Sequence, residues 1–288
     1  MIECAAMNVG FRCFCAFAAM LLSIQSAKSR PLDDVVASGT LRIIAYADNR
    51  PFSWEGSAGE PRGIDVDLGR AIAQKLGVKA EIVLRMQGEQ VDDDLRANVW
   101  KGPLTGGGVG DIMMHVPTDK DFVNRNREAV IGNAYFEERV AVAVDSDRLT
   151  NVTSFDIFKT QPIAVQLGTV ADYFLLTYDD GALINNVHHY VRPPEGAERF
   201  LEKETIALMG VRSQIEGLLY EKRAKTTILE PPMPGIARSR WVVGMAVSEQ
   251  SRDLRDAVGN ALNDLRKTGQ LQKIFAAYGV SYFPPPKN

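Results

Sequence analysis

Residues Leu41 to Gly77 read LRIIAYADNRPFSWEGSAGEPRGIDVDLGRAIAQKLG. The apolar residues at 41–46 predict a strand, and the three-and-four spacing of apolar residues at 68–76 predicts an amphipathic helix. A polar loop with aromatic residues joins the two. Open α/β sheets bind ligands at the carboxyl ends of their strands. The stretch therefore predicts one side of a small-molecule cleft, with three candidate ligand contacts: Asp48, Phe52 and Trp54.

The overall composition is that of an ordinary globular protein. The chain has 288 residues, of which 45% are hydrophobic, enough for one large or two medium domains. Its formal net charge is −3, and no block of Lys and Arg stands out. Nucleic acid and anionic membrane surfaces are therefore not expected as partners.

The first 27 residues have the layout of a secretory signal peptide. Residues 14–24 are almost all apolar, Arg12 precedes them, and Ser26 and Ala27 follow. The apolar run is shorter than the roughly 20 residues that a membrane span needs. We therefore expect export to the periplasm, cleavage near Ala27 and no membrane-embedded segment. A buried N-terminal helix is the alternative interpretation.

The cysteines and histidines restrict the possible chemistry. All three cysteines, Cys4, Cys13 and Cys15, lie in the expected leader, so the mature chain would contain none. This excludes a disulfide framework and a cysteine nucleophile. The adjacent His188 and His189 would point to opposite sides of a strand, so no metal site and no cofactor are expected. No Ser/His/Asp arrangement or G-x-S-x-G motif supports nucleophilic catalysis.

Strand-like and helix-like segments alternate along the rest of the chain, which predicts a sheet covered by helices on both faces. The strands are expected at 41–46, 79–84, 111–116, 139–144, 163–166 and 241–247, with 140–144 central and buried. Apolar stripes predict two helices over 254–265 and 271–278, and Ser251 is a candidate N-cap of the first. The proline-rich end, 283–288, is expected to be loose.

Three segments resemble the bacterial extracellular solute-binding proteins of family 3, the amino-acid-binding type that serves ABC importers. The first carries Pro51-Phe52, Gly63-Ile64-Asp65-Val66-Asp67-Leu68 and Leu76-Gly77. The second is IAVQLGT at 163–169, and the third covers 241–280. The resemblance implies an α/β fold of two lobes, a type II periplasmic binding protein. Each lobe would be a mixed sheet flanked by helices, and two crossing strands would join them.

The same resemblance implies where the lobes begin and end. Residues 28–144 and 241–288 would form a discontinuous first lobe, and residues 145–240 would form the second. One crossing strand would lie near 140–145 and the return strand near 241–244.

Gly168 and Thr169 are the candidate ligand contacts of the second lobe. A strand that ends at Gln166, followed by a glycine and a helix start, leaves backbone N–H groups and the positive helix end as an anion site. The family receives a ligand carboxylate at this turn. Simple N-capping without a ligand is the alternative interpretation.

His115 is a further candidate, because it lies near the carboxyl end of an expected strand. In the family this strand is followed by a Thr-x-x-Arg pattern whose arginine clamps a carboxylate. Here Thr118 is followed by Asp119, Lys120 and Asp121, so the arginine is absent at the matching place. Arg125 or Arg127 could reach the cleft instead. The departure makes a standard α-amino acid doubtful as the ligand.

Three functional hypotheses follow. The first is a monomeric, non-enzymatic periplasmic protein that captures a small polar, anionic or zwitterionic ligand by hinge closure and presents it to an ABC permease. The second is an accessory protein of a periplasmic PQQ-dependent quinoprotein alcohol dehydrogenase with a modified cleft, since 111–117 and Tyr135-Phe136 resemble that branch. The third is an enzyme similar to cyclohexadienyl dehydratase, with Glu216, Glu221 or His115 as acid or base.

Overall fold

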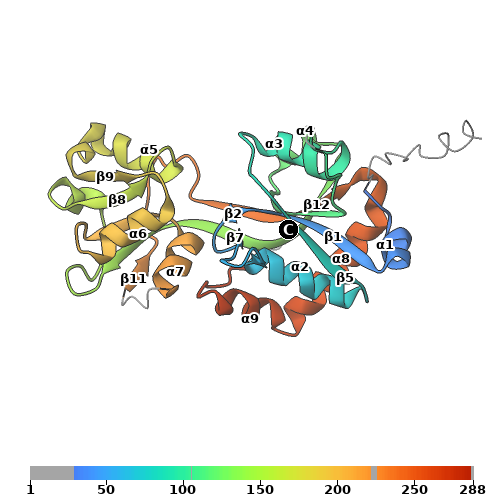
Figure 1. Cartoon of the computed structure of the whole chain (residues 1–288). Helices are drawn as coiled ribbons and strands as arrows, with labels where there is room; N and C mark the ends of the chain where they lie inside the picture. Colours follow the sequence, from blue (N-terminus) through green and yellow to red (C-terminus); the bar gives the residue numbers. More distant parts are fainter. Residues whose placement is uncertain (1–28, 105, 222–225, 287–288) are drawn as a thin grey trace, which may run out of the picture.

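The structure is a computed structural model that describes residues 29–104, 106–221 and 226–286. Figure 1 shows two helix-covered bodies joined by extended strands. We call the body that contains β1 (Thr40–Tyr46) and α2 (Ile64–Lys75) the first lobe, and the body that contains β8 (Ile163–Gln166) and α5 (Val170–Thr177) the second lobe. The expected signal peptide lies outside the described residues. Within the described ranges, no helix has the length and apolar character to cross a bilayer.

The first lobe is built on a five-stranded part of the sheet. The order is β5 (Lys79–Arg85), β1, β6 (Ile112–Pro117), β12 (Arg240–Ser248) and β7 (Ala129–Asp145). β1 is parallel to β5 and β6, whereas β12 is antiparallel to both of its neighbours. A short second sheet contains β2 (Asp48–Asn49), β3 (Ser53–Glu55) and β4 (Pro61–Arg62).

Apolar side chains cover both faces of this sheet. One core cluster packs α2, α8 (Arg252–Lys267) and α9 (Gln270–Ala277) against the strands, and α1 (Leu32–Ser38) contributes Val35. The other cluster contains residues of α3 (Val91–Leu95), the following π-helical turn (Arg96–Trp100) and α4 (Lys120–Arg125). Burial of apolar surface on two faces is the main stabilising contribution here.

The second lobe uses the other end of β7. There β7 pairs antiparallel with β10 (Ala207–Val211) and with β11 (Thr226–Leu229). β10, β8 and β9 (Val187–Tyr190) follow in that order and run parallel. Helix α5 packs on one face, and α6 (Pro193–Leu201) and α7 (Arg212–Glu221) pack on the other. Short 3-10 turns are Phe155–Lys159, Tyr178–Gly181, Ile184–Asn186 and Glu249–Ser251.

Strand β7 and strand β12 carry the chain between the lobes. β7 is 17 residues long and pairs with β12 from Ala129 to Arg139, then with β10 and β11 from Val140 onward. The prediction that 140–144 is central and buried is confirmed, because these five residues are at most 3% exposed, all pair with β10, and 142–144 also pair with β11. The residue boundaries of the lobes stay a prediction.

The two predicted C-terminal helices are confirmed as α8 and α9. The apolar stripe of α8, including Leu254, Val258 and Leu265, is fully buried. Ser251 is the N-cap residue of α8 as expected, but its side chain makes no capping bond. The hydroxyl of Ser248 instead accepts a bond from the N–H of Gln250, one turn earlier.

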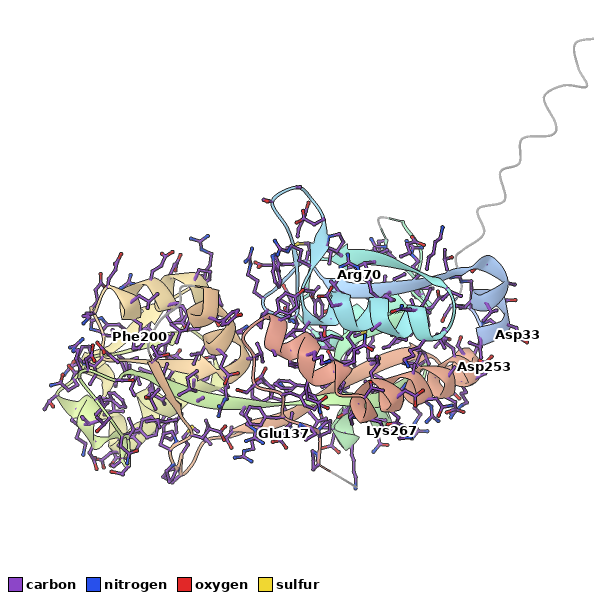
Figure 2. All side chains as sticks on the ribbon, turned by 90° about the horizontal axis from the view of Figure 1, so that it is seen from below. Asp33, Arg70, Glu137, Phe200, Asp253 and Lys267 are labelled. Atoms are coloured by element: carbon purple, nitrogen blue, oxygen red, sulfur yellow. The ribbon has the colours of Figure 1, made fainter. Side chains whose placement is uncertain are left out.

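The segment after α9, residues 279–286, bridges the two lobes. The prediction of a loose end is therefore wrong at 283, where the chain is bonded, and residues 287–288 lie outside the described part of the chain. The N–H of Ser281 donates to Glu216 Oε2 at 2.7 Å, on α7 of the second lobe. Two guanidinium groups contact the ring of Phe283, and its centre lies 3.8 Å from Cζ of Arg139 and 4.7 Å from Cζ of Arg212. Figure 2 shows the neighbouring Glu137, whose N–H donates to the carbonyl of Phe283, between the two bodies. Cation–π contacts and a charge-assisted hydrogen bond thus hold the proline-rich end in place.

Candidate functional site

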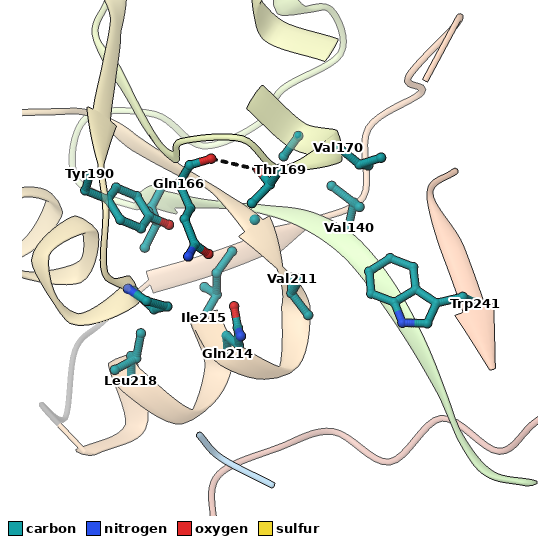
Figure 3. Close-up of a pocket in the computed structure, with 14 residues that line it drawn as sticks. Val140, Gln166, Thr169, Val170, Tyr190, Val211, Gln214, Ile215, Leu218 and Trp241 are labelled. Atoms are coloured by element: carbon teal, nitrogen blue, oxygen red, sulfur yellow. Dashed lines mark hydrogen bonds between the residues drawn. The ribbon is translucent and has the colours of Figure 1, made fainter. Parts of the chain in front are cut away.

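A cavity of about 70 Å³ lies at the carboxyl ends of the parallel strands β8, β9 and β10 (Figure 3). The chain runs from β8 to β9 on one side and then returns to β10 on the other side of β8. Such a reversal leaves a crevice beyond the strand ends, where open α/β sheets bind ligands. The residues that line it are Val140, Gln166, Thr169, Val170, Ala171, Tyr190, Pro193, Leu208, Gly210, Val211, Gln214, Ile215, Leu218 and Trp241.

Residues from the crossing strands complete this cavity. Val140 belongs to β7 and Trp241 to β12, so the cavity lies where the second lobe meets the connection to the first lobe. Gln166 ends β8, and its amide nitrogen donates to the carbonyl of Val191 at 3.2 Å. At about 70 Å³, this cavity is smaller than the roughly 300 to 1,000 Å³ of typical ligand pockets.

Thr169 lines this cavity, but the turn around it is already occupied by protein groups. The hydroxyl of Thr169 donates to the carbonyl of Gln166 at 2.8 Å and accepts from the N–H of Asp172 at 3.2 Å. The N–H of Gly168 donates to the carboxylate of Asp172 at 2.8 Å. The N–H of Gly168 is thus bonded within the protein, and Thr169 is the N-cap of α5. A ligand role for Gly168 and Thr169 stays a prediction.

The side chain of Asp172 binds the backbone at the N-terminus of α5. It is 3% exposed, and its other oxygen lies 2.8 Å from Nε2 of His189. A carboxylate in the first turn is favourable because the helix N-terminus carries a partial positive charge. The contact with His189 has no local sequence signal, because it depends on β9 lying beside β8.

Phe52 and Trp54 follow β1 as predicted, but both are buried in the first lobe. Phe52 is 2% exposed, and its ring centre is 4.3 Å from that of His115 and 6.3 Å from that of Phe275. Trp54 is 6% exposed and packs edge-on against Tyr278. Neither of them lines the second-lobe cavity. Phe52 and Trp54 therefore pack in the core of the first lobe. Asp48, in β2, is exposed.

His115 belongs to a cluster of polar side chains beside Phe52. Its Nδ1 lies 3.4 Å from Oδ2 of Asp65 and 3.4 Å from the hydroxyl of Tyr135, which itself donates to Oδ1 of Asp65. Asp65 and Tyr135 are completely buried, and burial beside Asp65 raises the pKa of Tyr135 well above its ordinary value. His115 has a φ of 60°, an unusual backbone conformation for a non-glycine residue. The sequence signal for Asp65 was only its place at a helix start.

Arg125 and Arg127, the two candidate replacements for the absent arginine, do not line the cavity. Arg125 pairs with Asp92 at 2.8 Å, and Nε of Arg127 donates to the carbonyl of Asn124 at 3.2 Å. Of the predicted contacts, the structure therefore brings Thr169 to the cavity, with Gly168 beside it in the same turn. Asp48, Phe52, Trp54 and His115 lie in the other lobe.

Glu138 is a buried carboxyl group between the lobes. It lies on β7, is 2% exposed, and accepts hydrogen bonds from the hydroxyl and the N–H of Ser213 on α7 and from the N–H of Arg139. Burial raises the pKa of Glu138 to about 7, although these hydrogen bonds act in the opposite direction.

We expect Glu138→Gln to remove one pH dependence of stability. Folded Glu138 keeps its proton up to about pH 7, whereas the unfolded chain releases it near 4.5, so folding loses stability as the pH rises between these values. The loss is on the order of 3 kcal/mol. Glutamine keeps acceptor and donor positions for Ser213 and Arg139. In urea titrations from pH 4 to 8, the difference in free energy of unfolding between wild type and variant should change only between about pH 4.5 and 7.

The matched control is Glu198→Gln, at an exposed position on α6. It should leave the pH dependence as in the wild type. A constant difference between wild type and Glu138→Gln over the whole range would show that Glu138 ionises normally.

Two lobes of mixed sheet and flanking helices, joined by β7 and β12, define an α/β periplasmic binding protein fold. Among solved structures, the chain resembles an ancestral cationic amino acid solute-binding protein (AncCDT-1), with a TM-score of 0.68 and 22% identity over 86% of this chain and 99% of that one. The fold class expected from the sequence is thereby confirmed.

Residues 41–100 match the family model of bacterial extracellular solute-binding proteins, family 3. The L-cystine-binding protein TcyJ of Escherichia coli strain K12 is 24% identical over 84% of each chain. A probable amino-acid ABC transporter periplasmic-binding protein, y4tE, of Sinorhizobium fredii is 25% identical over 92% of this chain and 84% of its own. The chain is therefore similar to bacterial solute-binding proteins over most of its length, and residues 41–100 carry the family 3 pattern.

A shorter match concerns an enzyme. Cyclohexadienyl dehydratase of Pseudomonas aeruginosa is 39% identical over 61 residues, which is 21% of this chain and 22% of the enzyme. The two relatives that match over most of the chain are named as binding proteins. Nothing in these comparisons supports the branch associated with quinoprotein dehydrogenases.

Proposed function

We propose that this protein captures an amino acid or a closely related small molecule in the periplasm and presents it to an ABC importer. The observation that carries the proposal is the cavity at the carboxyl ends of β8, β9 and β10, beside the connection between the lobes. The names of the two relatives that match over most of the chain support the ligand class, and the name of y4tE supports the transporter and the compartment.

The proposed mechanism is closure of the two lobes about β7 and β12. The moving bodies would be residues 28–144 with 241–288, and residues 145–240. The ligand binds first in the second-lobe cavity at Thr169, and the first lobe then adds Asp48 and His115 from the ends of β1 and β6. Phe52 and Trp54 support that surface from the core. Closure requires that the ligand bind the closed state more tightly than the open state.

His115 is well suited to hold one ligand group from the first lobe. Its Nδ1 faces the buried Asp65 and Tyr135, so Nε2 points away from them, and the side chain is 18% exposed. A buried carboxylate that orients one ring nitrogen fixes the position of the other. This imidazole could bind the ligand carboxylate in place of the missing arginine.

The proposal is tested by titrating the purified protein with single amino acids. Isothermal titration calorimetry should detect at least one ligand, and small-angle scattering of the same mixture should show a smaller radius of gyration. Failure of all twenty common amino acids and L-cystine to bind would refute the proposal.

Thr169→Ala should weaken the binding of such a ligand about tenfold, equal to about 1.4 kcal/mol. Loss of the N-cap should also lower the free energy of unfolding by about 1 kcal/mol. Calorimetry and urea unfolding measure the two effects. Thr177→Ala is the control, because Thr177 is exposed at the other end of α5 and binds only backbone carbonyl groups. Equal affinities for both variants would show that Thr169 does not contact the ligand.

The dehydratase hypothesis is the second candidate, favoured by the 61-residue match alone. It needs a proton donor or acceptor in the cleft. Glu216 is engaged by Arg212 and by the N–H of Ser281, and the side chain of Glu221 lies outside the described part of the chain, which leaves His115 as the described candidate. Incubation with prephenate or arogenate decides between the functions, since formation of the aromatic product would establish an enzyme.

A further inference from the structure

The second-lobe cavity has an unusual lining for a site that would bind an amino acid. Among the described residues, none of those that line it carries a charged side chain. Most are apolar, and the polar groups are two amides, Gln166 and Gln214, two hydroxyls, Thr169 and Tyr190, and the indole N–H of Trp241. This lining offers no counter-ion to a charged ligand group.

The charged residues closest in sequence to the lining residues are already paired. On α7, Arg212 and Glu216 flank Gln214 and bind each other at 2.8 Å. Arg212 also binds Glu230 at 2.6 Å. Glu216 also accepts the N–H of Ser281, and Arg212 lies over the ring of Phe283, so both side chains already have partners in the fold.

The charged residue of α5 nearest to the cavity is also already paired. Asp172 follows the lining residue Ala171, but its two oxygens bind the N–H of Gly168 and the ring of His189. A positively charged ligand group in the cavity would therefore find no free carboxylate from α5. Transfer of a charge from water into such surroundings without a partner is strongly unfavourable.

The shape of the lining favours a compact apolar group. Figure 3 shows the indole of Trp241 at one end of the cavity, with Val140 and Val211 near it and Gln166 and Gln214 facing from the other elements. Apolar walls stabilise a hydrocarbon or thioether group by removing its surface from water. The amides can bind a neutral polar atom of the ligand.

From these observations we infer that the second-lobe cavity binds an uncharged, mainly apolar side group, such as an aliphatic, thioether or aromatic group. The inference rests on the proposed function and specifies its substrate class. Amino acids with cationic or anionic side chains are excluded from this cavity. The class thus differs from the cationic amino acids named for the ancestral structural neighbour.

Calorimetry with five probes tests the inference. The full chain, exported and then unfolded and refolded to remove carried ligand, is titrated with L-leucine, L-methionine, L-phenylalanine, L-arginine and L-glutamate. At least one of the first three should bind at least tenfold more tightly than L-arginine and L-glutamate. Equal or tighter binding of L-arginine or L-glutamate would overturn the substrate class but keep the proposed function. Binding of none of the five would overturn the substrate class, and the wider titration then decides the proposed function.

A variant tests whether this cavity determines which ligand side group is bound. Gln214→Glu keeps the size of the side chain and adds a negative charge, so it should weaken the best apolar probe at least tenfold and strengthen L-arginine. Gln272→Glu is the control, since Gln272 is exposed on α9 of the first lobe. If both variants bind the probes as the wild type does, the side group binds elsewhere. Circular dichroism establishes that each variant is folded.

Discussion

Gly63→Ala is expected to lower the free energy of unfolding by about 3 kcal/mol or more. Gly63 has a φ of 125°, and an added Cβ would lie 2.2 Å from the carbonyl oxygen of Phe52. That neighbour is backbone and cannot rotate away. The close approach allows the N–H of Ile64 and of Asp65 to donate to the carbonyls of Pro51 and Phe52. Alanine would therefore push the loop away from the start of α2 and break both bonds.

Gly77→Ala is the matched control at the other end of the same helix. Gly77 also has a positive φ, 74°, but an added Cβ would meet nothing within 4 Å. Only the conformational strain remains, which is about 1 kcal/mol. Urea unfolding of both variants measures the difference. Equal losses would show that contact with Phe52 does not require glycine at position 63.

Phe275→Ala is expected to lower the free energy of unfolding by about 3 to 5 kcal/mol. Phe275 is completely buried, and its ring centre lies 4.8 Å from Phe136 and 5.1 Å from Tyr282. It therefore joins three parts of the first lobe: α9, β7 and the segment 279–286. Removal of the ring leaves a cavity that these rigid elements cannot fill. The midpoint of urea unfolding reports the loss.

Phe283→Ala is the comparison, because this ring is partly exposed and contacts two arginine side chains. Its loss should be about 1 kcal/mol, the usual size of a cation–π contact. A small effect of Phe275→Ala, similar to that of Phe283→Ala, would contradict the packing described for α9.

The fold was predictable because its strongest periodic patterns lie in 41–77 and 241–280. The apolar spacing of α2, α8 and α9 places each helix face correctly. Other elements have weaker patterns. β9 contains His188 and His189, which are typical of surface loops, and the first half of β7 carries Gly132, Asn133 and two glutamates. These segments become strands because neighbouring strands supply their hydrogen bonds, which no local pattern reveals.

The candidate site was predictable only in part. Thr169 was found because a strand, a glycine and a helix start follow one another in the chain. The cavity also contains residues from three elements that are distant in sequence: Val140, Gln214 and Trp241. They meet because β7 and β12 both pass between the lobes at this point. An aromatic residue in a loop, such as Phe52, has the same sequence signal whether it contacts a ligand or fills the core. Its burial is a property of the whole lobe.

The position of β12 has a consequence for how the chain assembles. β12 lies between β6 and β7, so the N-terminal half of β7 has no sheet neighbour on that side until residues 240–248 have been synthesised. The partners of β7 in the second lobe, β10 and β11, come earlier in the chain. Non-local pairing is slow. The connectivity therefore allows the second lobe, which is inserted into the first, to fold first. The sheet of the first lobe is completed afterwards by β12, the last strand in the sequence.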